Sequence, residues 1–177
     1  MTDLSVYDLP FEGIEKSVMA WVTEALELRH GAAGDPDGPL APVPREAGPE
    51  AIDAMLFRAR QRSDRVDELL SKVTMAKARA KRAQEAATFQ ADIARDEALR
   101  KNSGGRRVEF ATRDERNANA ALDSLEERRT AHAAARLVSV TAEAYEVVNQ
   151  VHWSLSGIRQ DLRQQLSSFQ FESTLER

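Results

Sequence analysis

The sequence predicts an all-α fold, in which a short amphipathic helix precedes a long antiparallel helical hairpin with coiled-coil-like packing. Three observations predict it: residues 50–101 contain no glycine or proline, apolar residues recur at heptad spacing, and aromatic residues make up only 6% of the chain. Such a composition suits long paired helices better than a thick globular core. The 177 residues divide into an acidic N-terminal helix (1–30), a flexible Pro/Gly linker (31–49) and the hairpin (50–177), which breaks near 102–111.

Composition narrows the class of protein further. Cysteine is absent, which excludes disulfides, thiolate nucleophiles and cysteine metal sites and favours a reducing compartment. The N-terminus has no basic start followed by an apolar run, and no stretch approaches the roughly 18 apolar residues that cross a bilayer. We therefore expect a cytoplasmic protein that has no membrane partner.

The first predicted helix covers residues 11–30. Its apolar side chains recur at alternating steps of four and three residues and so share one face: Ile14, Val18, Trp21, Ala25 and Leu28. The linker that follows holds four of the eight glycines and five of the six prolines, which deny it a helix. A helix tethered in this way can bind in a groove of a partner protein through Ile14, Val18, Trp21 and Leu28.

The first long helix is predicted to begin at Pro49, because proline suits the first helical position, and to run to about Lys101. At about 1.5 Å per residue its length is ~75–80 Å. One heptad thread is Val66, Val73, Ala80, Ala87 and Ala94, and the second seam holds Leu69, Ala76 and Ala83. Alanine at these positions lets helices approach closely but contributes little packing energy, so the helix needs neighbours.

The second long helix is predicted to begin at Thr112, which forms a capping box with Glu115, and to run to about Ser168. Its clearest heptads are Leu137, Ala144, Val151 and Ile158, alternating with Thr141, Val148, Leu155, Leu162 and Phe169. We interpret one set as the core of a homo-oligomer or bundle: Leu137, Ala144, Val148, Val151, Leu155, Ile158 and Leu162. Between Leu125 and Leu137 the register slips, which indicates a stutter or a change of partner helix.

Charge is distributed unevenly along the chain. Residues 1–57 hold three Lys/Arg and eleven Asp/Glu, residues 58–116 hold sixteen and ten, and residues 117–177 hold six and eight. The middle segment thus carries a net charge of +6 in a chain whose net charge is −4. This asymmetry indicates a polyanionic partner or the association of unlike ends, and an ordinary solvated helix face is the alternative.

The candidate nucleic-acid-binding residues are cations at helical or loop spacing, because a phosphate backbone is met by several long cations in this way. They are Lys72, Lys77, Arg79, Lys81, Arg82, Arg100, Lys101, Arg106 and Arg107. Phe89 and Phe110 offer surfaces on which bases can stack. Coiled coils that bind no nucleic acid also contain Arg/Lys-rich helices, so the pattern leaves both interpretations open.

No pattern of catalytic or metal-ligating residues is present in the sequence. The three histidines, His30, His132 and His152, lie far apart, and none belongs to a carboxylate–histidine set. The pair Gly104-Gly105 lacks the Lys-Ser/Thr of a phosphate-binding loop. We therefore predict a non-enzymatic protein that has no catalytic residues, no metal, no cofactor and no small-molecule substrate.

The order of segments in the hairpin has a parallel in a known family. A Lys/Ala-rich helix (72–94) and a short polar break precede a capped long helix that ends in VVNQVHWSLSGIRQDLRQQLSSFQFES (147–173). This organisation resembles that of the UvsY-like phage recombination mediators. The likeness covers about residues 55–173 and rests on organisation and on positions such as Trp153, Ile158 and Arg159. The acidic N-terminal helix and its linker are not part of the family's pattern.

The resemblance implies a phage-encoded, non-enzymatic, ring-like oligomer. Such a protein binds single-stranded DNA and helps a RecA-type recombinase to replace single-strand binding protein. The resemblance also implies that residues 72–82 contact the DNA and that residues 137–169 form the assembly core. The alternative function is a coiled-coil scaffold or adaptor, in phage assembly or host interaction, that binds a protein partner through the N-terminal helix.

Overall fold

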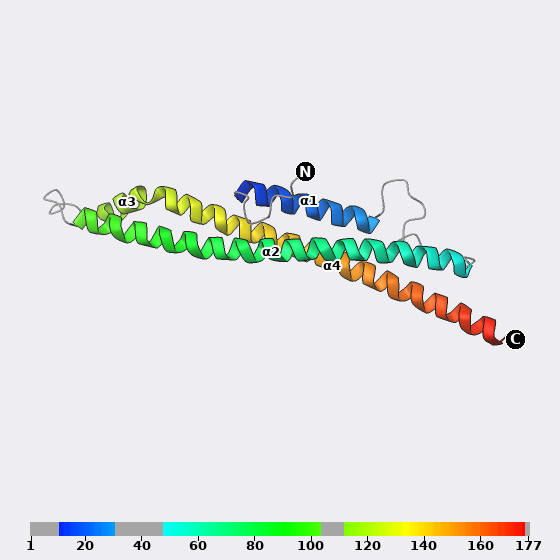
Figure 1. Ribbon diagram of the computed structural model, residues 1–177. Coiled ribbons are helices and arrows are strands. Elements are labelled where there is room, and N and C mark those ends of the chain that lie inside the picture. Colours follow the sequence, from blue (N-terminus) through cyan, green and yellow to red (C-terminus); the bar gives the residue numbers. More distant parts are fainter. Residues whose placement is uncertain (1–10, 31–47, 104–111, 176–177) are drawn as a thin grey trace. The chain divides into compact units, whose positions relative to one another are not determined.

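The computed structural model describes residues 11–30, 48–103 and 112–175. The helices are α1 (Phe11–His30), α2 (Pro49–Ser103), α3 (Arg113–Asp123) and α4 (Leu125–Leu175), which are labelled in Figure 1. Within these ranges only Gly48, Thr112 and Ser124 lie outside a helix and no residue forms a strand, so the all-α prediction is confirmed. Most of the linker (31–47) and the loop residues 104–111 lie outside the described ranges, and with them Arg106, Arg107 and Phe110.

The starts of α2 and α3 follow the local signals in the sequence. The carbonyl oxygen of Gly48 accepts hydrogen bonds from the backbone N–H groups of Ala51 (3.1 Å) and Ile52 (3.2 Å), so α2 begins at Pro49 as predicted. At α3, the Thr112 hydroxyl accepts from the Glu115 N–H (3.2 Å), and the Glu115 carboxylate accepts from the Thr112 N–H (2.8 Å). The capping box is therefore confirmed.

The prediction of a single helix from Thr112 to about Ser168 is wrong in one respect, because the helix is interrupted at Ser124. The Ser124 hydroxyl donates to the carbonyl oxygen of Ala120 (2.9 Å), and its backbone adopts φ −103° and ψ 22°. The Ser124 backbone N–H also donates to the carbonyl oxygen of Ala120 (3.2 Å), so the preceding turn is kept while the dihedral angles of Ser124 depart from helical values. The break lies one residue before the segment in which the heptad register slips, and α4 then continues to Leu175.

The chain divides into two compact units. Unit 1 consists of Met1–Glu15 and Ala76–Ala142, and unit 2 consists of Lys16–Met75 and Glu143–Arg177. Helices α1, α2 and α4 each contribute residues to both units. The units therefore combine segments that the three-part division of the sequence keeps apart.

Unit 2 has a core of large aliphatic side chains from antiparallel helices. One cluster consists of Ile52, Met55, Leu56, Ala59 and Leu162, against which Ile158, Leu166 and Phe169 pack. Farther along the seam, Ser63 of α2 pairs with Arg159 of α4, and one turn later Asp67 pairs with His152. Since the α4 number falls as the α2 number rises, these two helix segments run antiparallel.

Unit 1 has a core of mainly small side chains. Its buried residues are Ile14, Ala76, Ala80, Ala91, Ala98, Ala120, Ala134 and Leu137, together with Ser124 and Thr141. Ala91 and Asp92 of α2 line the same cavity as Ser124 and Arg128, whereas Arg95 lies toward α3, so the pairing is antiparallel here as well. Buried apolar area stabilises in proportion to its size, so each alanine layer of unit 1 contributes less than a Leu/Val layer of unit 2.

No helix in the described ranges is both long and apolar enough to cross a membrane.

Candidate nucleic-acid interface

Seven of the nine predicted nucleic-acid-binding cations lie on α2, and Arg106 and Arg107 lie outside the described residues. Lys72 belongs to unit 2, and the others belong to unit 1: Lys77, Arg79, Lys81, Arg82, Arg100 and Lys101. The structure thus gathers six of the predicted cations on the α2 segment of a single unit.

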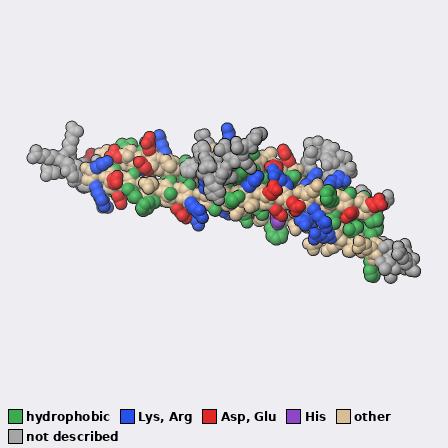
Figure 2. Space-filling view, in the orientation of Figure 1, with side chains coloured by type: hydrophobic (Ala, Val, Ile, Leu, Met, Phe, Trp, Pro, Cys, Tyr) green, Lys and Arg blue, Asp and Glu red, His purple; other side chains and the backbone are tan. Residues whose placement is uncertain are grey.

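These cations differ in their surroundings. Lys81, Arg82 and Lys101 are exposed and form no ion pair with any residue that the structure describes. Lys77 and Arg79 are half-buried, and each already takes part in a hydrogen bond, ion pair or other electrostatic interaction. Figure 2 shows basic and acidic side chains interspersed on the visible face. On this face a strand would therefore meet individual cations rather than one broad positive surface.

Arg82 and Phe89 share one face of α2 in unit 1. They are seven residues apart, which is two helical turns, and both side chains point to solvent. The Phe89 ring is 63% exposed although a large aromatic side chain gains stability by burial. The arrangement places a charge for a phosphate and a ring for a base on the same side of a helix.

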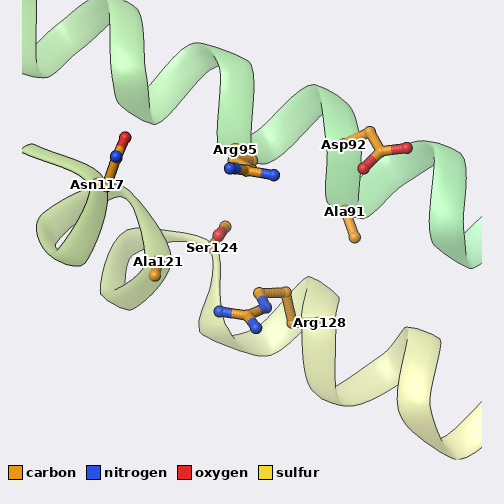
Figure 3. Close-up of a pocket in the computed structure, with 7 residues that line it drawn as sticks. All are labelled: Ala91, Asp92, Arg95, Asn117, Ala121, Ser124 and Arg128. Carbon is orange, nitrogen blue, oxygen red and sulfur yellow. The ribbon is translucent and has the colours of Figure 1, made fainter. Parts of the chain in front are cut away.

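A cavity of about 250 Å³ lies in unit 1, where α2 faces the junction of α3 and α4. Its walls are Ala91, Asp92, Arg95, Asn117, Ala121, Ser124 and Arg128. Figure 3 shows Arg95 extending from α2 and Arg128 from α4, on either side of Ser124. Three of the lining residues are alanine or serine, so no large side chain fills the space.

Arg95 and Arg128 were not among the residues selected from the sequence. Arg95 is followed by Asp96 and Glu97, and Arg128 follows two glutamates, so neither stands out as part of a basic cluster. The Ser124 hydroxyl and the register slip beyond it were the signals that could have pointed to a gap at this level of the seam. Neither arginine forms an ion pair with a residue in the described part of the chain.

The residues predicted to form an oligomer core lie in the interior of a single chain. Leu137, Ala144, Val148, Val151, Leu155 and Leu162 are buried, and Ile158 is half-buried against the unit 2 cluster. Packing within the chain already uses these side chains. An oligomer of folded chains would therefore need a different surface.

The residues predicted to bind a partner protein are also largely covered. Ile14 and Val18 are buried, and Trp21 and Leu28 are half-buried. The helix that carries them also makes polar contacts: the Arg62 guanidinium donates to the carbonyl oxygen of Leu28 (3.3 Å). Binding in a partner's groove through this face would require α1 to leave its own chain.

Ion pairs attach α1 in both units. In unit 1, Arg136 pairs with Glu15 (2.8 Å), and in unit 2 Arg65 pairs with Glu24 (2.6 Å). The hydrogen bonds that Arg65 donates to Glu24 and then to Glu68 raise the pKa of its guanidinium above the ordinary value. Arg65 therefore stays charged at neutral pH.

His152 on α4 is half-buried, and its Nδ1 lies 2.6 Å from Oδ1 of Asp67, with the Trp153 ring edge-on at 5.4 Å. The His152–Asp67 pair joins α2 and α4 in unit 2. Among the described residues, no group of three or more His, Cys, Asp or Glu side chains is placed to hold a metal ion.

Comparisons with protein-family models, with curated proteins and with solved structures found no match to this chain.

Proposed function

We propose that this protein is a non-enzymatic, single-stranded-DNA-binding accessory protein. The observation that carries the proposal is the α2 face of unit 1, where exposed Arg82 and the exposed Phe89 ring lie two turns apart. Cations that follow the backbone and aromatic rings on which bases stack are the two components of sequence-independent single-strand binding. Lys81 and Lys101, which are also exposed, extend the run of cations on α2.

More specifically, we propose that the protein is a recombination mediator that helps to load a RecA-type recombinase in place of single-strand binding protein. The order of segments in the hairpin, which resembles that of the UvsY-like mediators, supports this more specific function. In this form the α2 cations contact the strand, and the protein acts as an oligomer in a phage-infected cell.

The test is fluorescence anisotropy with labelled oligo-dT at two salt concentrations, with Arg82→Gln and Phe89→Ala. Counterion release makes the affinity fall with salt, and loss of one phosphate contact should lower the slope of log K against log salt by about 0.7. Loss of one stacking ring should weaken binding by about 1–3 kcal/mol with little change in that slope.

Matched controls are available in unit 2. Phe171 is 67% exposed and has no cation within one turn in either direction, and Arg163 is an exposed arginine on the same helix. Phe171→Ala and Arg163→Gln should bind oligo-dT like the unaltered chain. If the unaltered chain fails to bind at low salt, the single-strand proposal is overturned.

The second candidate function, a coiled-coil scaffold or adaptor, is favoured by large exposed apolar side chains in unit 2. Trp153 is 65% exposed and Phe57 is 60% exposed. Exposed aromatic residues are typical of protein interfaces. Because the apolar face of α1 is covered, these two side chains are more accessible to a partner protein than Ile14 or Val18. A scaffold should bind oligo-dT at neither salt concentration.

A further inference from the structure

We infer that the cavity between α2 and the α3–α4 junction is a phosphate-binding site that takes one phosphate group of a bound strand. This inference rests on the proposed single-strand binding and locates a contact that the basic segment of α2 does not include. Ala91, Ala121 and Ser124 leave a cavity of about 250 Å³, which is ample for a phosphate group with its ester oxygens.

The charges of the residues that line the cavity favour an anionic ligand. Arg95 and Arg128 bring two guanidinium groups from opposite helices, and neither forms an ion pair with the residues that the structure describes. Asp92 is the one acidic residue in the lining, which therefore keeps a net charge of +1. In Figure 3 the Asp92 carboxylate points away from Arg95. It therefore leaves that guanidinium available for a ligand.

A phosphate group matches the donors that the lining offers. A guanidinium presents a planar fork of N–H groups that matches two phosphate oxygens, and two forks on opposite walls can hold one tetrahedral group. The Asn117 amide supplies a further N–H donor. The Ser124 hydroxyl already donates its hydrogen to the Ala120 carbonyl, so it offers only acceptor capacity to a ligand.

The helix break explains why this space exists at this level of unit 1. Ser124 is the single residue between α3 and α4, and it is fully buried against the seam. A leucine at residue 124 would place a larger side chain in this space. Arg128 follows one turn later on α4, so its long side chain can border the space that serine leaves open.

The experiment compares the double variant Arg95→Gln with Arg128→Gln against a control of equal charge, Arg129→Gln with Arg163→Gln. Both control arginines are exposed, and neither lines the cavity. Binding of labelled oligo-dT is measured by anisotropy, and backbone amide signals of Ala121 and Ser124 are followed by NMR in the ¹⁵N-labelled full chain. Circular dichroism and urea midpoints verify that each variant is folded.

The expected result is a loss of affinity of at least tenfold in the cavity variant and a change of less than threefold in the control. The Ala121 and Ser124 signals should shift with oligo-dT in the unaltered chain and in the control but not in the cavity variant. If all three proteins bind oligo-dT alike, or those signals do not move on binding, the cavity inference is overturned while the proposed function stands.

A second probe separates the two proposals. Inorganic pyrophosphate presents the same phosphate chemistry without a strand. If oligo-dT fails to bind at low salt but pyrophosphate moves the Ala121 and Ser124 signals in the unaltered chain and in the control and not in the cavity variant, single-strand binding and the assignment of a strand phosphate are both overturned, and the site belongs to a free phosphate ligand. If neither probe moves the signals, the cavity holds no phosphate.

Discussion

Arg159 of α4 donates a hydrogen bond from Nη1 to the Oγ of Ser63 on α2 (2.8 Å), across the seam of unit 2. Ser63 is buried, and the Nε of Arg159 is also buried, with no hydrogen-bond partner among the described residues. A cation and a hydroxyl thus replace a hydrophobic layer between the aliphatic cluster at Ile52 and the valine-rich layers that follow. Such a polar layer fixes the register of two helices whose apolar faces would tolerate sliding.

We predict that Ser63→Ala lowers the free energy of unfolding by about 1–3 kcal/mol, because a part-buried guanidinium loses its acceptor. The urea midpoint of the full chain is the measurement. Ser71→Ala is the matched control, since Ser71 is exposed on the same helix and gains the same helix propensity. Equal midpoints for the two variants would show that the contact does not contribute to stability.

Leu155→Ala should lower the free energy of unfolding by about 2–5 kcal/mol, because it leaves a cavity in the aliphatic core of unit 2. Leu155 is fully buried within one chain, so the loss should not depend on protein concentration. Leu122→Ala is the control, because that leucine is 67% exposed. A midpoint that rises with protein concentration would instead place Leu155 between copies of the chain.

The apolar face of α1 should contribute more to its docking than its ion pairs do. Val18→Ala removes two methyl groups from a fully buried site and should cost about 1.5 kcal/mol. Glu24→Gln removes a pair whose two side chains are 43% and 36% exposed, and such pairs contribute only about 0.2–1 kcal/mol. Thermal unfolding of both variants is the measurement, and a larger effect from Glu24→Gln would reverse this ranking.

Thr112→Ala should weaken the start of α3 by about 1 kcal/mol, because the variant loses the hydroxyl that accepts from the Glu115 N–H. Hydrogen exchange should become faster in the first turn of α3 while unit 2 is unchanged. Thr130→Ala is the control, because the Thr130 hydroxyl only bonds back to the carbonyl of Glu126 within α4. Unchanged exchange in that first turn would mean that the capping box does not stabilise α3 in solution.

Local signals in the sequence were sufficient to predict the starts of α2 and α3. Pro49 and Thr112 with Glu115 marked helix starts correctly, because capping depends on residues only one turn apart. Heptad spacing also identified buried positions such as Val66, Val73 and Leu155, since it specifies which face of a helix is apolar. Ser124 was not predicted because a serine by itself does not indicate a break: the same side-chain bond to the preceding turn occurs at Thr130, where α4 continues.

The sequence alone therefore determined the helical class, the starts of α2 and α3 and the apolar faces, because each depends on neighbours within one or two turns. Only the tertiary structure decided what covers those faces: the heptads of α4 and the apolar side of α1 pack within their own chain. Periodicity describes one helix at a time and does not name its partner. For the same reason only the antiparallel pairing of unit 1 brings Arg95 and Arg128, which are far apart in sequence, to a single cavity.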